Sequence, residues 1–261
     1  MKKLYILFDG ANLFYRCFFA AKGNRSQVFS IFHRYLDKVG QRFCNTNTEF
    51  VFFWDSPRNW RTKVTPNYKE TRRQSRKGKK TLYEQLYFQM DLLKEKLEDK
   101  QYQIEGYEAD DVISLFIRTV SEKFSKKQYF LIVSTDKDYM QLIEDNETKG
   151  VAQLKPGKNW EYVTYEKFCK LYGFEPSYYA SILALMGDSS DNVKGVPGIG
   201  EKRAADLVRK YGDLRKWILD KDDEGDPMKR TCLNNVEGIE RDLRLVDLEN
   251  SDIFKFETLE L

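Results

Sequence analysis

The sequence predicts an α/β protein whose central sheet is mostly parallel and is flanked by helices. Three short apolar runs, rich in aromatic and β-branched residues, are typical of buried strands, and each reaches an aspartate at its end: residues 3–9, 49–55 and 129–138. Apolar residues at helical spacing lie between them, at 82–97 and 112–120. Strands that alternate with helices favour parallel pairing. The 261 residues suffice for one large domain with a smaller appendage.

Composition and charge exclude several classes of protein. The chain has 44 basic and 41 acidic residues, and no apolar run approaches the ~20 residues of a membrane span. The opening run MKKLYILFDG ends near an aspartate and lacks a small-residue cleavage site, so it predicts a strand and not a signal peptide. Four scattered cysteines, no CxxC and a single histidine argue against a zinc site and against a disulfide framework. We therefore expect a cytoplasmic protein with reduced thiols and no membrane contact.

Carboxylates gather where the predicted strands end and where a following helix begins. The set comprises Asp9, Asp55, Glu108, Asp110, Asp111, Asp136, Asp138, Asp188 and Asp191. In open parallel sheets the carboxyl ends of the strands share one edge, where ligands bind. A single such aspartate is most often a turn or cap residue, but here the pattern repeats after every predicted strand. So many carboxylates need countercharge, which Mg²⁺ or Mn²⁺ supplies, and nine of them indicate two ions.

A basic segment follows the second predicted strand. Residues 58–80 hold ten Lys or Arg and one acid, with Trp60 and Tyr68 among the cations. Aromatic and cationic side chains together suit a nucleic-acid single strand that is stacked upon and neutralised. The alternative is a solvated charged loop without function.

A glycine-rich turn, GVPGIGEK at 195–202, marks the second half of the chain. It matches neither a P-loop nor a dinucleotide-binding turn. It fits a tight hairpin between two helices, whose backbone N–H groups hold one phosphate without reading bases. The alternative is a plain turn between helices.

Taken together, the motifs resemble those of the flap endonuclease/5′-nuclease family. They occur in the order FDGANLFYR, WD, YKETR, GYEADD, STDKD, GDSSDN and GVPGIGEK. The likeness is to the 5′-nuclease domain of bacterial DNA polymerase I and to stand-alone bacteriophage 5′-exonucleases, and it spans residues 3–250. It implies a PIN-like nuclease core at 1–174, with a helical arch at about 58–98, and a DNA-binding helix-hairpin-helix region at 175–261.

The resemblance also implies roles for single residues. The nine carboxylates become ligands of two Mg²⁺ ions, which Mn²⁺ can replace, and the hairpin becomes a site for K⁺. Basic residues near the active centre are expected to be catalytic: Arg16, Lys22, Lys69 and Arg72. Of these, Lys69 and Arg72 would steady the scissile phosphate, and Tyr68 would stack on a base. The expected DNA-binding residues are Arg61, Tyr68, Arg73, Gly195, Gly198, Gly200, Lys202 and Arg203.

The implied function is a structure-selective, divalent-metal-dependent 5′-3′ exonuclease and flap endonuclease. It would hydrolyse DNA phosphodiesters near 5′ ends or flap junctions in replication or repair. Its partners would be flap, nicked or junction DNA, an RNA primer in an RNA/DNA hybrid, and a DNA polymerase acting in trans, with the protein itself a monomer.

Two alternatives are weighed against this function. A PIN-type ribonuclease would lack the GVPGIG hairpin and usually the GDSSDN acids. A catalytically inactive DNA-binding or scaffold protein on the same fold would have lost some of the nine carboxylates. The sequence keeps all of these features.

Overall fold

The protein is described by a computed structural model that covers residues 2–219, 222 and 225–249. Its centre is a seven-stranded sheet in the order β3-β2-β1-β4-β6-β5, with β7 paired to β6. The strands are β1 Leu4–Asp9, β2 Thr48–Phe53, β3 Lys100–Tyr102, β4 Gln128–Val133, β5 Glu144–Asp145, β6 Lys149–Lys155 and β7 Glu161–Val163. The neighbouring strands β3, β2, β1, β4 and β6 pair parallel with one another. Strands β5 and β7 each pair antiparallel with β6. The predicted fold class is therefore confirmed.

Helices connect and cover these strands. They are α1 Gly10–Ala20, α2 Arg25–Phe43, α3 Arg61–Val64, α4 Glu70–Lys77, α5 Lys80–Lys96, α6 Ala109–Lys123, α7 Tyr165–Tyr172, α8 Tyr179–Met186, α9 Glu201–Tyr211, α10 Leu214–Trp217, α11 Pro227–Leu233 and α12 Val236–Val246. Short 3₁₀ turns, η1 and η2, occupy Asp138–Leu142 and Pro176–Tyr178. Among the described residues, none of these helices has the length and apolar character to cross a membrane.

The sheet is buried on both faces, which explains its continuous apolar strands. One side of β1 packs with α1, α2 and α5, where Phe8 stacks on Phe52 at 4.7 Å between ring centroids. The other side packs with α6, where Tyr5 meets Phe116 edge-on at 5.5 Å. Alternate residues of β1 thus serve opposite cores, as the period of two in a strand requires.

The strand register brings three predicted acids to one edge of the sheet. Asp9 is paired with Phe53 of β2, and Phe8 with Val133 of β4. Asp55 and Asp136 therefore lie just beyond the ends of the two neighbouring strands. The carboxyl edge of the sheet is the edge at which acids were expected.

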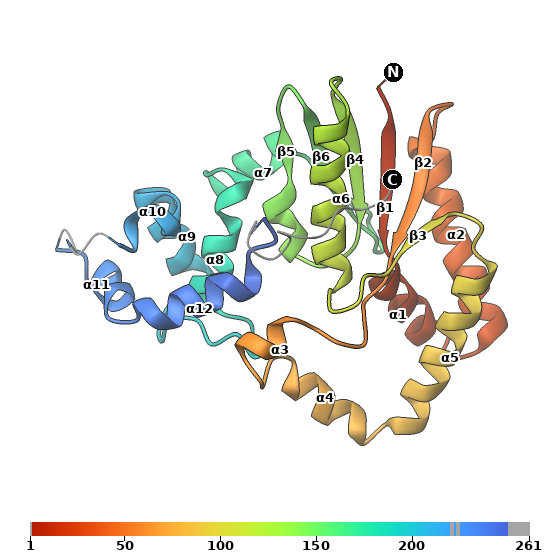
Figure 1. Ribbon diagram of the computed structural model, residues 1–261, viewed down its shortest axis with the longest axis horizontal. Helices are drawn as coiled ribbons and strands as arrows, with labels where there is room; N and C mark the ends of the chain where they lie inside the picture. The colour runs from red at the N-terminus through yellow and green to blue at the C-terminus, as the bar shows by residue number, and fades with distance from the viewer. Residues whose placement is uncertain (1, 220–221, 223–224, 250–261) are drawn as a thin grey trace.

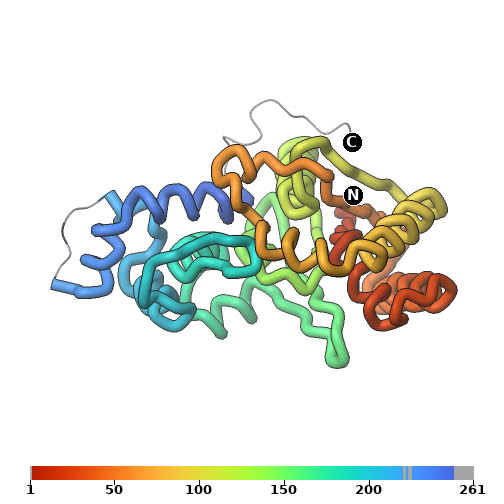
Figure 2. The backbone as a smooth tube through the Cα atoms, turned by 90° about the horizontal axis from the view of Figure 1, so that it is seen from below, coloured from red at the N-terminus to blue at the C-terminus, as the bar shows by residue number. Residues whose placement is uncertain are grey.

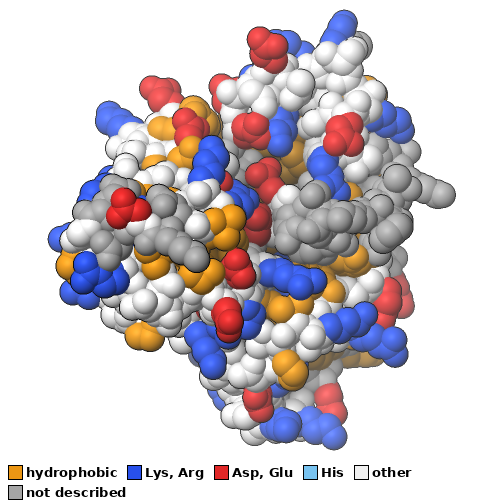
Figure 3. Space-filling model, turned by 60° about the vertical axis from the view of Figure 1, so that its left-hand side comes forward, with side chains coloured by type: hydrophobic (Ala, Val, Ile, Leu, Met, Phe, Trp, Pro, Cys, Tyr) orange, Lys and Arg blue, Asp and Glu red, His pale blue; other side chains and the backbone are white. Residues whose placement is uncertain are grey.

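The segment between β2 and β3 forms an arch outside this edge. Helices α3, α4 and α5 cross from the side of α12 to the side of α1 (Figure 1). Seen from below, this part of the chain runs across the front of the molecule (Figure 2). The C-terminal helices α8, α9 and α12 form their own apolar cluster beside the sheet. On the face drawn in Figure 3, basic and acidic side chains are interspersed.

Candidate metal centre and DNA interface

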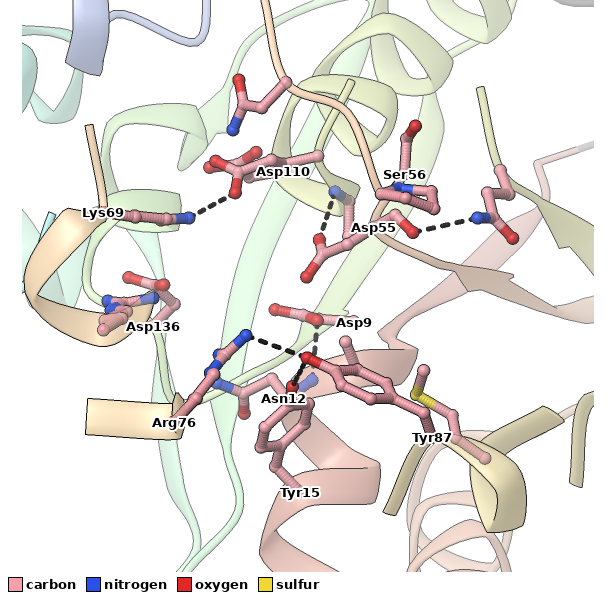
Figure 4. Close-up of a pocket in the computed structure, with 18 of the residues that line it drawn as sticks. Asp9, Asn12, Tyr15, Asp55, Ser56, Lys69, Arg76, Tyr87, Asp110 and Asp136 are labelled. Atoms are coloured by element: carbon pink, nitrogen blue, oxygen red, sulfur yellow. Dashed lines mark hydrogen bonds and ion pairs between the residues drawn. The ribbon is translucent and has the colours of Figure 1, made fainter. Parts of the chain in front are cut away.

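A cavity of ≈790 Å³ lies at the carboxyl edge of the sheet, between the core and the arch. It is lined by acids from the core and by cations from α1 and the arch. The predicted acids among its lining are Asp9, Asp55, Glu108, Asp110 and Asp136, and the predicted cations are Arg16, Lys69, Arg72 and Arg73. In Figure 4, Asp9, Asp55, Asp110 and Asp136 point toward a common space that Lys69 faces from the arch. The cavity therefore juxtaposes both signs of charge.

Asp9 is held in place by the start of α1. Its Oδ1 accepts a hydrogen bond from the backbone N–H of Asn12 at 3.0 Å, as an N-cap residue does. Its Oδ2 accepts from the hydroxyls of Ser134, at 3.0 Å, and Tyr139, at 3.2 Å. Burial, and next the charge of Asp55, raise the pKa of Asp9 to about 7. Asp9 is thus both a cap and a poorly compensated buried acid.

The start of α6 holds the acids of the GYEADD motif in different directions. Glu108 forms a capping box with Asp111, whose Oδ2 accepts from the backbone N–H of Glu108 at 3.0 Å. Asp55, two residues after the end of β2, fixes the same turn, because its Oδ1 accepts from the N–H of Ala109 at 2.9 Å. Asp110 lines the cavity, and burial raises its pKa well above the ordinary value although Arg61 opposes this. The motif therefore places Glu108 and Asp110 at the cavity and Asp111 in the interior beside it.

Four cations neutralise the acids in the structure. Lys69 contacts Glu108 and lies 3.7 Å from Asp191. Arg72 pairs with Asp191 at 2.6 Å, and Lys137 pairs with Asp188 at 3.2 Å. Arg61 pairs with Asp111 at 2.7 Å, with Glu108 at 3.3 Å and with Asp110 at 3.9 Å. Burial opposes ionisation of Glu108, but Lys69 and Arg61 lower its pKa overall.

The nine predicted carboxylates gather near the cavity, but these cations occupy some of their oxygens. Five line the cavity. Asp138 adjoins Asp136, whose Oδ1 accepts its backbone N–H at 3.0 Å, and Asp188 and Asp191 lie on the loop after α8. Within the described ranges, no three of the carboxylate, His or Cys side chains are arranged as a formed ion site. Lys69 and Arg72 hold oxygens of Glu108 and Asp191 instead.

The donor set nevertheless fits a hard divalent cation. Asp138 Oδ1 is buried, with no hydrogen-bond partner among the described atoms. Burial, then the charge of Asp136, raise the pKa of Asp138 to about 8, and burial also raises the pKa of Asp55. Raised pKa values at converging buried carboxylates indicate missing positive charge. An oxygen-liganded Mg²⁺ or Mn²⁺ is the chemistry that would supply it.

The pKa shifts predict a stability that depends on pH and on divalent ions. Asp9 and Asp138 have folded-state pKa values of about 7 and about 8, above the ordinary 3.8, so the folded state holds more protons. In EDTA, the Tm should therefore fall as pH rises from about 4 to about 8. Mg²⁺ binds deprotonated ligands and should raise the Tm more at pH 8 than at pH 5. Thermal melts at both pH values, with EDTA or Mg²⁺, measure this.

The Asp138→Asn variant is the matched control for this titration. It removes one raised group and should flatten the fall of Tm with pH in EDTA. A Tm that rises between pH 5 and pH 8 in EDTA, or a Mg²⁺ effect of equal size at both pH values, would contradict the assignment.

Asp111 was predicted to be an ion ligand, and the structure places it away from the cavity lining. This residue is 0% exposed and does not line the cavity. Its Oδ1 and Oδ2 accept hydrogen bonds from Arg61 Nη2 and Nη1, both at 2.7 Å, and Oδ2 also accepts from Trp60 Nε1 at 3.1 Å. In the structure, both oxygens of Asp111 are occupied by a buried guanidinium. Asp111 orients the start of α6 instead.

Two arch residues expected to contact DNA are also placed differently. Arg61 is 1% exposed, and its Nε donates to the carbonyl of Leu245 at 2.7 Å, so its side chain is held away from the surface. Tyr68 is 4% exposed, and its hydroxyl donates to Glu108 at 3.0 Å and to Asp191 at 3.3 Å. Its ring is not free to stack on a base. Both side chains connect the arch to acidic residues of the core, Arg61 to Asp111 and Tyr68 to Glu108.

The remaining predicted residues lie in three places: the cavity lining, the surface near α1 and the hairpin. Arg16 and Arg73 line the cavity, and Arg16 Nε is buried without a hydrogen-bond partner among the described atoms. Lys22 is exposed and does not line the cavity. The hairpin residues Gly198, Gly200, Lys202 and Arg203 are exposed outside it. Gly195 is less exposed than these hairpin residues, and its backbone N–H donates to Asp242 at 2.8 Å.

Sequence reasoning missed one group of cavity residues. Tyr15 Oη donates to Tyr87 Oη at 3.0 Å, and Arg76 Nη1 donates to Tyr87 Oη at 2.9 Å (Figure 4). Tyr15 lies within the FDGANLFYR motif, which was a signal available in the sequence. Tyr87 lies on α5, within the range 82–97 whose apolar residues predicted only a helix.

Comparison with known protein families gives two adjoining matches. The family described as "5′-3′ exonuclease, N-terminal resolvase-like domain" matches residues 4–173. The family described as "5′-3′ exonuclease, C-terminal SAM fold" matches residues 174–259. Together the two matches extend over nearly the whole chain.

Individual proteins are similar over most of the chain. The 5′-3′ exonuclease of Buchnera aphidicola subsp. Schizaphis graminum is 33% identical over 223 residues, which are 82% of this chain and 72% of that protein. DNA polymerase I of Bacillus caldotenax is 32% identical over 91% of this chain, which corresponds to 27% of the polymerase. The fold matches that of the bacteriophage T5 D15 flap endonuclease, solved as a pseudo-enzyme-product complex with DNA and metal ions. Its TM-score is 0.74 at 22% identity, and the match covers 94% of this chain and 89% of that one.

Proposed function

Because this chain belongs to the 5′-3′ exonuclease family, we propose that it is a structure-selective nuclease that hydrolyses DNA phosphodiesters near 5′ ends and flap junctions. The observation that carries this proposal is the cavity in which core acids face arch cations. A phosphodiester is an anion that must be held by cations while water attacks it. The cavity offers both requirements within one space.

The acids are the proposed ligands of two Mg²⁺ ions, with Mn²⁺ as a substitute. Those assigned to ion binding are Asp9, Asp55, Glu108, Asp110, Asp136, Asp138, Asp188 and Asp191. Bound divalent ions would lower the pKa of an attacking water and offset the charge of the phosphodiester and its leaving oxygen. Asp111 is left out of this set because Arg61 occupies both of its oxygens.

The arch cations are the proposed phosphate-binding residues. Lys69 and Arg72 lie at the cavity and pair with Glu108 and Asp191. A DNA phosphate that enters the cavity gives them a second anionic partner. They would then steady the scissile phosphate, with Arg16 beside them, and the products would carry a 5′-phosphate and a 3′-hydroxyl.

The hairpin is the proposed grip on duplex DNA. It ends at Gly200, the N-cap residue of the 11-residue helix α9, whose first turn carries Lys202 and Arg203. Backbone N–H groups at a helix N-terminus bind phosphate without reading bases. As the resemblance implies, we also assign one K⁺ ion to this turn. Selectivity would then come from DNA shape.

We further propose the biological setting that this activity requires. A polymerase that extends into a downstream strand creates the flap, so a DNA polymerase acting in trans is the proposed partner. The strand removed would be DNA or an RNA primer in an RNA/DNA hybrid. We place the protein in the cytoplasm as a monomer.

Cleavage of a 5′-labelled flap duplex tests this function. With Mg²⁺ the protein should cut near the junction, and with EDTA it should bind the duplex without cutting it. A single strand of the same sequence, which lacks the duplex for the hairpin, is the matched control and should be cut much more slowly. Product mapping at nucleotide resolution separates exonuclease from flap endonuclease activity.

Two results would favour the alternatives. Binding without cleavage in Mg²⁺ and in Mn²⁺ would support a scaffold protein on this fold. Cleavage of single-stranded RNA in preference to the flap would support a PIN-type ribonuclease.

A further inference from the structure

Residues 187–195 form one closed loop that carries two acids and leads directly into the hairpin. Asp188 and Val193 exchange both backbone hydrogen bonds, each 2.9 Å between N and O. Gly187 and Gly195 meet where the loop closes, and a Cβ on Gly195 would lie 2.5 Å from the backbone N of Gly187. Both glycines have positive φ, 73° and 66°, which other residues rarely adopt. The acid loop and the hairpin therefore form one backbone unit.

The buried carboxylate of Asp242 accepts a hydrogen bond from the end of this loop. Asp242, on α12, is 1% exposed, and its Oδ2 accepts the N–H of Gly195 at 2.8 Å. Its Oδ1 accepts from Nε and Nη2 of Arg241 at 2.9 and 2.7 Å. A buried carboxylate is retained when it is paired and hydrogen-bonded, and bonds that involve a charged group are among the stronger ones. Asp242 thus fixes the place at which Gly195 lies.

One turn further along α12, the backbone contacts Arg61, which bonds to Asp111. The carbonyl of Leu245 accepts from Arg61, which binds Asp111 at the start of α6. Helix α12 also contacts α8, which leads into the acid loop, and α3 at the base of the arch (Figure 1). The hairpin, the acid loop and the arch base therefore share one support.

We propose that Asp242 is a positioning residue that sets which phosphodiester is cut. It fixes the spacing between the phosphate held at the hairpin and the phosphate that enters the cavity. Asp242 does not line the cavity, so its effect passes through Gly195 and the loop. This inference rests on the proposed nuclease function and adds a determinant of the cleavage position to it.

The Asp242→Ala variant of the whole chain tests the inference on the 5′-labelled flap duplex with Mg²⁺. Wild-type protein should give one dominant product. The variant should spread its cuts over neighbouring phosphodiesters and slow single-turnover cleavage by about 10- to 100-fold, as misplacement of a reacting group does. Binding of the flap duplex, measured by fluorescence anisotropy in EDTA, should change little. Asp242→Asn keeps an oxygen acceptor for Gly195 and should restore the single product.

Two further variants complete the design. Glu240→Ala removes an exposed acid from the same helix and should leave the product and the rate unchanged. Asp242→Glu keeps the carboxylate but moves it by one methylene, so it should also spread the cuts. This variant gives the same readout if the alanine variant is too unstable to assay.

The outcomes separate this inference from the function on which it rests. Wild-type cleavage together with an unchanged product from Asp242→Ala or Asp242→Glu would overturn the positioning role alone. Loss of rate without any spread of cuts, in Asp242→Asn as well, would reduce Asp242 to a folding residue and overturn the role too. Absence of cleavage by the wild type would overturn the nuclease function and this inference with it.

Discussion

Asp110→Asn should abolish most cleavage while leaving the protein folded and able to bind a flap duplex. Asp110 lines the cavity, and burial raises its pKa well above the ordinary value, so its charge is poorly compensated in the folded protein. A divalent ion contributes several kcal/mol of charge stabilisation in a transition state, and each 1.36 kcal/mol is tenfold in rate. We expect single-turnover cleavage to fall on the order of 10³-fold. Quenched-flow cleavage and anisotropy binding measure the two effects separately.

Stability gives the second readout for the same variant. Burial of Asp110 outweighs the charge of Arg61, which lies 3.9 Å away, so its ionised form is disfavoured in the folded protein. Asp110→Asn removes this ionisable group, so the Tm in EDTA should rise or stay unchanged, and the Tm gain on adding Mg²⁺ should shrink. A variant that cuts at the wild-type rate would remove Asp110 from the ion-binding set. A variant that melts much earlier than wild type would mean that Asp110 serves the fold.

Arg61→Met should destabilise the whole protein, and its effect should be much larger than that of any exposed arch cation. The guanidinium is 1% exposed and bonds to Asp111 through two nitrogens and to the carbonyl of Leu245 through a third. Removing one partner of a buried ion pair leaves an uncompensated charge and costs about 3–5 kcal/mol. At roughly 2–4 °C per kcal/mol for a chain of this size, the Tm should fall by roughly 6–20 °C. Urea unfolding, followed by circular dichroism, gives the free energy of unfolding directly.

Two control variants test whether the loss of stability comes from the buried ion pair. Arg58→Met removes a cation three residues earlier whose side chain is 85% exposed, and an exposed pair is worth about 0–1 kcal/mol. The double variant Arg61→Met/Asp111→Leu removes both buried charges and should recover much of the lost stability. An Arg61→Met protein that is as stable as Arg58→Met, and has lost affinity for DNA instead, would restore the DNA-contact role for Arg61.

The sequence predicted the parts of the fold that depend on long apolar patterns. The runs at 4–9, 48–53 and 128–133 are strands because continuous apolar side chains can be buried on both faces. Strand β6, with the sequence KGVAQLK, was not predicted, since its ends are charged and its apolar residues are interrupted. It is a strand because it pairs with β4, which is a tertiary cause.

The site was predictable as a set of acids but not as a set of contacts. Asp110 and Asp111 are adjacent, and a helix turns roughly 100° per residue, so the two carboxylates must point in different directions. Which of them enters the cavity depends on where Arg61 lies. The position of Arg61 in turn depends on the carbonyl of Leu245, which is 184 residues away along the chain. A charge pattern contains no information about such a distant partner.

The ion pairs that Lys69 and Arg72 make with the acids have a consequence for how the protein responds to its ligands. An incoming phosphate would draw these cations away from Glu108 and Asp191 and so release oxygens for a divalent ion. A bound ion would, by the same exchange, release the cations for DNA. Coupling of this kind is reciprocal, so each ligand tightens the binding of the other. The protein would then bind the divalent ion and the DNA cooperatively, and either ligand alone would bind more weakly than both together.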